Sequence, residues 1–228
     1  MKKIVFFLFS FVFVAHCFAF PPGAFKPDGA SGWCIQKVKA LPKEPLSPKE
    51  KAWLLKMREE EKLAHDVYFT ILQRWPLRAF ENITNSEQKH MDMVKALLDK
   101  YGLKDPVKGL GMGYFKSKEF SELYSEMVKR GMKNFGEAIK VGAEIEELDI
   151  HDLQQALKEV DNQDVKLVFQ NLMKASRNHL RIFSNWLKKI GENYQPKYIS
   201  KEEYQKTIST PIERGPVDIN GKPIKRIN

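Results

Sequence analysis

A glutamate and a histidine three residues apart, Glu87 and His90, are the first residues of this sequence that suggest a chemistry. Three residues are nearly one turn of an α-helix, so the two side chains project side by side and can bind one metal ion or a bridged pair of ions. By itself the spacing is better explained by chance at a solvated helix start. The pair therefore needs support from other parts of the chain.

Similar polar residues occur on three other segments with helical patterns. An α-helix advances about 100° per residue, so each residue can be assigned to a face, and the buried face is expected to be apolar. Seven polar residues fall inside apolar stripes: Glu61, Glu87, His90, Glu146, Asp149, Ser176 and His179. Glu60 and His65 fall at the edge of a stripe. The residues expected outside the stripes are Glu59, Glu144, Glu147 and His151.

These residues would bring four carboxylates and two imidazoles into one core. Unpaired buried charges are unfavourable, so such a core requires a cation or extensive pairing. His179 alone would be interpreted as an ordinary core histidine, but the joint pattern favours a metal site. Carboxylate and imidazole ligands without thiolate suit iron or manganese, and zinc also accepts them. We expect two iron ions.

Helix signals place these residues on four long helices. Ser47, Pro48 and Glu50 form the start signal of a helix that continues to Trp75. A second helix is expected over residues 78–101, where Gly102 ends it. A third should run from Asn134 to about residue 159, and a fourth from about residue 161 to residue 191.

The connections between these helices predict their arrangement. The first and last connections are very short, so each pair should be antiparallel, whereas residues 102–133 form a long connection with an extra helix over residues 117–130. Short, long and short connections are typical of a four-helix bundle with one crossover. We predict an all-α fold in which residues 47–191 form a ferritin-like bundle. Residues 192–228 should be an irregular tail. The Asn220-Gly221 turn signal also permits a small hairpin there, which Pro223 disfavours.

The N-terminal segment has the features of a secretory signal peptide. Lys2 and Lys3 precede an apolar run over residues 4–15, and Cys17-Phe18-Ala19 offers a cleavage site. The run is shorter than the roughly 20 residues that span a bilayer, so a retained anchor is the weaker interpretation. We expect residues 1–19 to be removed and residues 20–46 to be a flexible lead-in. The mature chain would be exported, periplasmic or extracellular, with no transmembrane helix.

The net charge is +9, from 38 Lys and Arg against 29 Asp and Glu. A basic balance of this size suits nucleic acid or an anionic membrane surface. An exported protein seldom meets nucleic acid, so we expect no nucleic-acid partner, and contact with the cell envelope stays open. Without the leader, Cys34 is the one remaining cysteine, and the chain has no Cys-x-x-Cys motif. This excludes thiolate zinc sites and iron–sulfur clusters of the usual spacing.

Four segments together resemble the ferritin-like superfamily, and in particular an uncharacterised prokaryotic branch of exported ferritin-like proteins: MREEEKLAHDVY (57–68), SEQKHM (86–91), GAEIEELDI (142–150) and SRNHLR (176–181). In that superfamily two helices contribute one Glu each, and two contribute Glu-x-x-His, around a di-iron centre. The resemblance covers residues 48–190 and implies five metal ligands: Glu61, Glu87, His90, Glu146 and His179. Tyr68 resembles a tyrosine that often stands near such centres, and it is the candidate catalytic residue.

Ser176 departs from the pattern of this superfamily, because a bridging glutamate is expected at its position. Asp149 lies one turn after Glu146 and is a candidate for the missing carboxylate. The alternatives are an open coordination position, a site for a single metal ion, or a degraded site.

Two functional hypotheses follow from these residues. In the first, two ferrous ions support oxygen- or peroxide-dependent redox chemistry or iron oxidation, as in a ferroxidase- or peroxidase-like oxidoreductase. Its partners would be metal ions and oxygen or peroxide. A homodimer is compatible with the sequence. The sequence does not identify the electron donor. In the second, a metal-free bundle is a binding or envelope module in which Arg177 and Arg181 pair with buried carboxylates. Metal binding with a defined stoichiometry distinguishes the two.

Overall fold

The computed structural model describes residues 30–224, so the predicted leader, residues 20–29 and residues 225–228 lie outside the described residues. Between residues 30 and 224 the chain forms seven helices and no strand. They are α1 (Ala30–Ala40), α2 (Pro48–Arg74), α3 (Arg78–Tyr101), α4 (Lys118–Gly131), α5 (Phe135–Glu159), α6 (Gln163–Lys189) and α7 (Lys201–Ser209). The prediction of an all-α fold is confirmed for this part of the chain.

Local sequence signals set the ends of the helices. At the start of α2 the Ser47 hydroxyl accepts a hydrogen bond from the Glu50 amide at 3.2 Å, and the Ser47 amide donates to the Glu50 carboxylate at 2.9 Å. Gly102 ends α3 with a φ of 69°, a left-handed conformation that glycine adopts without strain. Asn134 caps α5 by accepting from the amide of Glu137. The long helices therefore begin and end close to their predicted positions.

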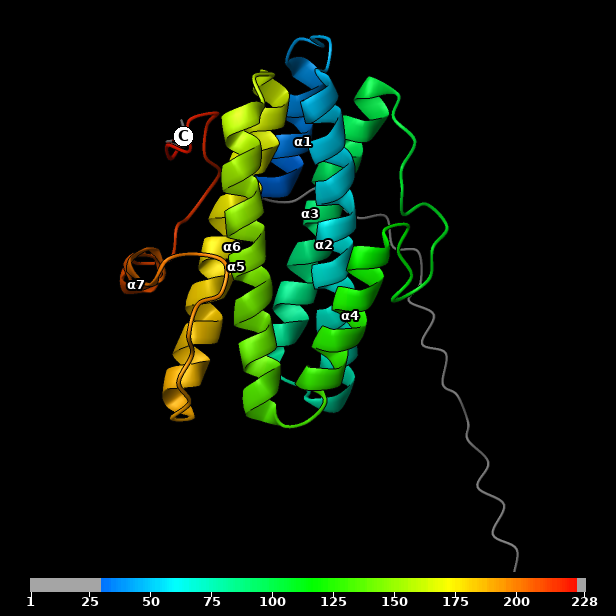
Figure 1. The fold of residues 1–228 in the computed structure, drawn as a ribbon. Coiled ribbons are helices and arrows are strands. Elements are labelled where there is room, and N and C mark those ends of the chain that lie inside the picture. The colour runs from blue at the N-terminus through cyan, green and yellow to red at the C-terminus, as the bar shows by residue number, and fades with distance from the viewer. Residues whose placement is uncertain (1–29, 225–228) are drawn as a thin grey trace, which may run out of the picture.

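The four long helices lie side by side (Figure 1). α2 packs along α3 and α5 along α6, and the two pairs contact each other through α2 with α5 and through α3 with α6. The helices of each pair are antiparallel, because only residues 75–77 and 160–162 separate them. α4 lies over α2 and α5, and α7 lies against α6. This arrangement directs the polar residues of the long helices towards a common interior.

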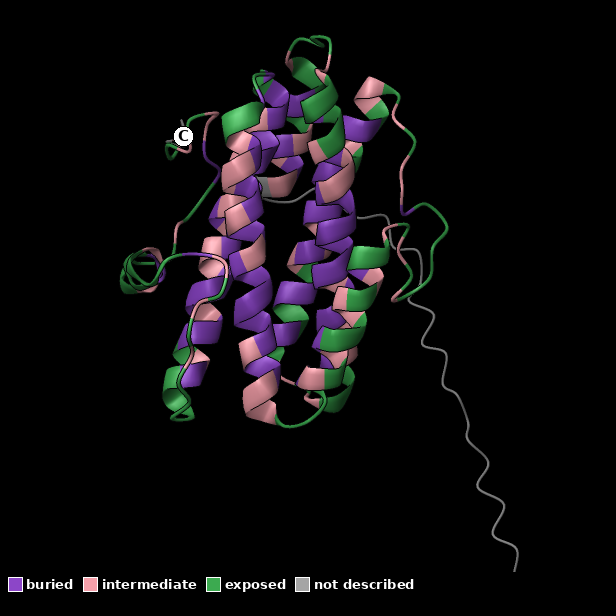
Figure 2. Cartoon of the chain, viewed as in Figure 1, coloured by how far each residue is buried: buried purple, intermediate pink, exposed green. Residues whose placement is uncertain are grey.

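Two apolar clusters fill this interior, and the candidate ligands fall between them. On α2, Met57 belongs to one cluster and Ala64 to the other, with Glu61 between them in the sequence. On α6, Leu172 belongs to the same cluster as Met57, and Leu180 belongs to the same cluster as Ala64. Figure 2 shows the buried residues following the inner faces of the long helices. The two clusters thus enclose a polar layer and separate it from water.

The expected flexible lead-in over residues 20–46 is wrong for residues 30–40, which form α1. Cys34 and Val38, one turn apart, are both fully buried, and α1 packs on α3 and α6. The Pro, Gly and Lys content of the whole stretch obscured this short apolar stripe. α3 and α6 supply the partner surface that makes the helix stable, since short helices depend on tertiary packing.

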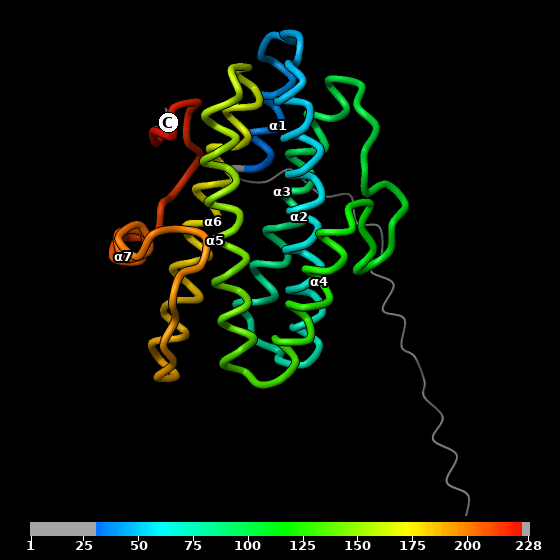
Figure 3. The backbone as a smooth tube through the Cα atoms, viewed as in Figure 1, coloured from blue at the N-terminus to red at the C-terminus, as the bar shows by residue number. Residues whose placement is uncertain are grey.

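The tail is also more ordered than its sequence suggests. Ser200 caps α7, a helix within the stretch expected to be irregular. The turn at Asn220-Gly221 does bring two segments together, but only as one isolated antiparallel bridge between Val217 and Pro223. Figure 3 shows the tail running back along the side of α5 and α6. It therefore covers part of the long helices.

Within residues 30–224, no helix combines the length and apolar character that crossing a membrane requires.

Candidate metal centre

Glu87 lies at the centre of the polar layer, fully buried between two histidines. Its Oε2 atom is 2.6 Å from His90 Nδ1, and its Oε1 atom is 2.9 Å from His179 Nδ1. His90 Nδ1 is also 3.2 Å from Glu61 Oε2, and His179 Nδ1 is 3.4 Å from Glu146 Oε2. All five side chains are at least nine-tenths buried.

These five residues form two overlapping groups that share Glu87. In each group the ligand atoms lie within 4.8 Å of one another; the first triad is Glu61, Glu87 and His90, and the second triad is Glu87, Glu146 and His179. The rings of His90 and His179 stack with their centroids 5.7 Å apart. Such an arrangement offers two adjacent cation positions with one carboxylate between them.

Further hydrogen bonds orient the side chains of the triads. The Ser86 hydroxyl lies 3.3 Å from His90 Nε2, while Nδ1 of the same ring faces Glu87. The Tyr68 hydroxyl is fully buried and lies 2.6 Å from Glu146 Oε1, to which it donates, and 3.1 Å from the Gly142 carbonyl. Metal ligands in proteins are commonly oriented by outer contacts of this kind. Tyr68 therefore contacts the second triad directly.

Several atoms of the triads lack a hydrogen-bond partner, although charged groups are close. The atoms without a partner are both Glu87 oxygens, Glu146 Oε2 and His179 Nδ1. Their contacts with each other are short, but the angles are outside the range of a hydrogen bond. Buried polar atoms are rarely left unsatisfied. A cation between these atoms would satisfy them, and three carboxylates with two imidazoles suit iron or manganese. The donor set therefore fits a metal centre.

The charges of the cluster are strongly coupled. Burial raises the pKa of Glu61 to about 7, against the opposing effect of His90. Burial also acts to raise the pKa of Glu87, but His90 and His179 outweigh it and hold that pKa well below its ordinary value. Burial acts to lower the pKa of His179, but Glu146 and Glu87 outweigh it and raise the pKa to about 9. Without a metal ion, the triads thus retain protons that a cation would replace.

The cluster lies within a region shared with a protein family. Residues 50–211 match the family described as Uncharacterized protein domain (DUF2202). The chain belongs to the DUF2202 family. It is 52% identical over 181 residues to the uncharacterized protein MJ0754 of Methanocaldococcus jannaschii, across 79% of this chain and 98% of that protein. A crystal structure of hypothetical protein MJ0754 from Methanococcus jannaschii is similar at a TM-score of 0.74 and 53% identity, covering 76% of this chain and 99% of that chain.

Two of the polar residues predicted inside the stripes of this DUF2202 chain lie outside the triads. Ser176 is buried, but its hydroxyl donates to the Leu172 carbonyl at 3.2 Å. Asp149 is buried and faces the carboxylates of both triads, yet it belongs to neither. Among the neighbouring charges, those of Glu61 and Glu60 act on it most strongly. Asp149 therefore lies beside the triads, and its role as an additional ligand stays a prediction.

Four acidic residues expected at the edge of a stripe or outside it are buried: Glu59, Glu60, Glu144 and Glu147. Arg130 of α4 and Lys197 of the tail each lie 2.7 Å from Glu144 Oε2, and the Lys197 and Tyr198 amides donate to Glu147. Glu59 accepts from two amides of the DUF2202 crossover. The periodicity of α2 and α5 could not show this burial, because the covering segments are distant in the sequence.

Arg177 and Arg181 form ion pairs with Glu213 of the tail, at 2.6 Å and 3.1 Å. The metal-free hypothesis expects them to pair with buried carboxylates of the bundle. No ion pair of that kind is found for either arginine within residues 30–224. Both arginines therefore pair with the tail rather than with the polar layer.

Proposed function

We propose that this chain is a ferritin-like metalloprotein in which α2, α3, α5 and α6 form a four-helix bundle around two metal ions. Iron is the proposed metal, and manganese or zinc are the alternatives that the ligand types permit. The observation that carries the proposal is the pair of buried triads joined by Glu87. The proposed ligands are Glu61, Glu87, His90, Glu146 and His179.

The proposed activity is redox chemistry with oxygen or peroxide, or the oxidation of iron. Two ferrous ions in a carboxylate site supply electrons for the reduction of oxygen or peroxide. The residues of the chain bind the ions, exclude water through the two apolar clusters, and hold Glu146 by its 2.6 Å hydrogen bond to Tyr68.

We also propose that the protein acts outside the cytoplasm. Support comes from the signal-peptide features of residues 1–19, namely two lysines, a short apolar run and small residues at the cleavage site. Mass spectrometry of the protein from its native host would show a chain that begins near Phe20. Retention of Met1 on the mature chain would contradict the proposal.

The first experiment measures the metal content of residues 20–228 after anaerobic loading with ferrous iron. We expect two irons per chain, and a visible spectrum that changes on exposure to oxygen or peroxide. A chain that retains no metal after desalting would contradict the proposed function. The polar layer would then be a structural network of protons and hydrogen bonds.

A double variant tests whether the triads are the residues that bind the metal. Glu87→Ala with His90→Ala should abolish tight iron binding and keep the helix content, as measured by elemental analysis and circular dichroism. His151→Ala is the matched control, because it removes an imidazole whose side chain is 40% exposed and lies outside both triads. Iron content equal to that of the wild type in the double variant would show that the triads are not the site.

A further inference from the structure

A second pair of buried carboxylates lies beside the triads and is not part of them. Glu60 is 1% exposed and Asp149 is 2% exposed. Both Glu60 oxygens and Asp149 Oδ2 lack a hydrogen-bond partner, and the two carboxyl groups interact electrostatically with each other. Ionised carboxylates only accept hydrogen bonds, so neither can satisfy the other. A pair of this kind is unfavourable unless a cation or a proton joins it.

The helix geometry places this pair between the triads and the surface. On α2, Glu60 lies one turn after Lys56 and directly before Glu61. On α5, Asp149 lies one turn before Asp152 and one turn after Glu146. α2 and α5 pack against each other, and Lys56 forms an ion pair with Asp152 across them. The two helices therefore carry a continuous row of charged groups that ends at the triads.

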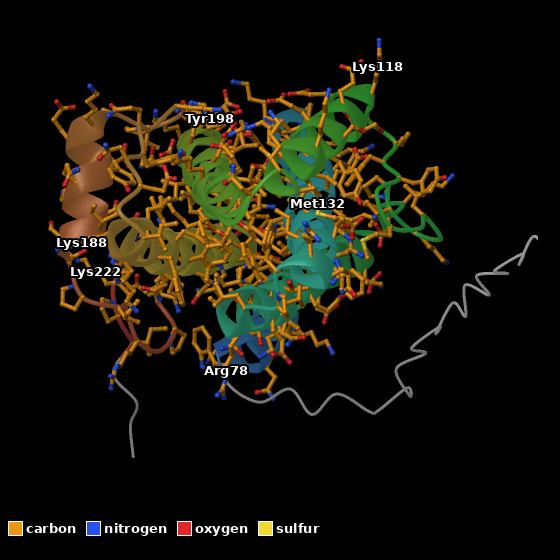
Figure 4. The ribbon with its side chains drawn as sticks, turned by 90° about the horizontal axis from the view of Figure 1, so that it is seen from below. Arg78, Lys118, Met132, Lys188, Tyr198 and Lys222 are labelled. Atoms are coloured by element: carbon orange, nitrogen blue, oxygen red, sulfur yellow. The ribbon has the colours of Figure 1, made fainter. Side chains whose placement is uncertain are left out.

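The outer end of this row opens into a hollow of about 380 Å³ between α2, α4 and α5. Its lining includes four carboxylates, those of Glu119, Glu122, Glu126 and Asp152, and two lysines, Lys56 and Lys118. Lys118 and Tyr198, which also lines the hollow, lie along one edge of the molecule in Figure 4. An excess of carboxylates in a concave surface raises the local concentration of cations.

We propose that Glu60 and Asp149 form a transit site for divalent cations on a route from this hollow to the triads. The Lys56–Asp152 ion pair closes the outer end of the route, and its lysine side chain is 35% exposed and free to swing into solvent. Glu60 and Asp149 then receive the ion and pass it to Glu61 and Glu146. The inference rests on the proposed function, since the route needs a destination that binds metal.

The test measures the rate at which Co²⁺ alone enters the metal-free protein, followed by visible absorbance after rapid mixing. Glu60→Gln and Asp149→Asn keep the side-chain volume and remove one charge each. Each should slow uptake by at least about tenfold, because the ion loses its charged intermediate position. The final number of Co²⁺ ions per chain should equal that of the wild type.

Lys56→Gln should have the opposite effect and accelerate uptake by a few fold, because it removes the cation at the mouth of the route. A purely structural role for these residues would not produce opposite changes in rate. Asp164→Asn is the matched control, since Asp164 is a buried carboxylate that contacts Lys100 and Tyr101 rather than the route. It should load at the wild-type rate.

The outcomes separate this inference from the proposed function. A wild-type protein that binds no Co²⁺ overturns both. Binding at the wild-type rate in Glu60→Gln and Asp149→Asn overturns the inference alone, and indicates that a shared proton satisfies the pair. A lower final number of ions in either variant also overturns it, because the residue would then be a resident ligand. If these variants do not fold, the uptake rate of Lys56→Gln, a variant at a half-buried position, decides the question.

Discussion

At the scale of single residues, Glu87 differs from the other acids of the layer because its two oxygens face two different histidines. Oε2 faces His90 at 2.6 Å and Oε1 faces His179 at 2.9 Å. Glu61 and Glu146 each face one histidine. The loss of Glu87 should therefore affect both cation positions, whereas the loss of Glu61 should affect one.

This asymmetry predicts different metal contents for two similar variants. Glu87→Gln should reduce the bound iron from two per chain to fewer than one, because a neutral amide bridges metal ions poorly. Glu61→Gln should retain about one iron per chain. Elemental analysis after anaerobic loading and desalting measures both values. Equal losses in the two variants would show that the ions do not share Glu87.

Tyr68 offers a test of the contact at the second triad. Tyr68→Phe removes the donor to Glu146 and should lower the free energy of unfolding of the metal-free protein by about 1–2 kcal/mol. The iron content should stay the same, because the ligands remain. Urea denaturation measures the stability, and Tyr114→Phe, at a residue that is 70% exposed, serves as the unchanged control. Loss of iron from Tyr68→Phe would mean that the phenol is itself a ligand.

At the scale of the elements, the segments that cover the four long helices decide which residues are buried. α1 closes one end over α3 and α6, α4 lies over α2 and α5, and the tail continues over α5 and α6. Cys34 illustrates the effect: the sequence leaves open whether this lone thiol is buried, reactive or paired with another molecule, and the fold buries it fully. Burial raises its pKa to about 12, against the opposing charge of Lys174.

The burial of Cys34 predicts its reactivity. The thiolate is the reactive form of cysteine. An aromatic disulfide reagent at pH 8 should therefore modify Cys34 at least about a hundredfold more slowly in the folded chain of residues 20–228 than in the unfolded chain. Guanidinium should restore reaction of one thiol per chain. Rapid modification of the folded protein, with α-helical circular dichroism unchanged, would show that α1 detaches from α3 and α6.

At the scale of the whole molecule, the polar layer makes stability depend on pH. A group with a higher pKa in the folded protein binds more protons there, so the free energy of unfolding falls as the pH rises through that window. Burial raises the pKa of Glu61 from 4.5 to about 7, and neighbouring glutamates raise that of His179 from 6.5 to about 9. The metal-free protein should therefore lose stability between about pH 5 and pH 9.

Thermal unfolding in the presence of a chelator checks this expectation. The Tm should fall from pH 5 to pH 9 in the metal-free protein, and the double variant Glu61→Gln with His179→Gln should show a flatter profile. Ferrous iron should raise the Tm most at the higher pH, because metal ions compete with protons for the same ligands. A metal-free Tm that rises steadily over this range would contradict the charge assignments of the triads.

The sequence by itself determined the elements and the inward residues of the long helices, because both are encoded locally. Capping residues such as Ser47 and Asn134 set the helix ends, and the helical period placed Glu61, Glu87 and His179 on buried faces. The Glu87-x-x-His90 spacing is a property of one helical turn. Five of the six predicted ligands meet in the two triads for this reason.

Only the tertiary structure decided what covers the edges of those helices and which charges pair. Glu147 is buried under the tail, Arg181 pairs with Glu213, and Asp149 lies beside the triads without being part of either. α1 was missed because its stability comes from the surface on which it packs. A helical pattern defines one face of one segment, whereas burial and pairing depend on segments that are far away in the chain.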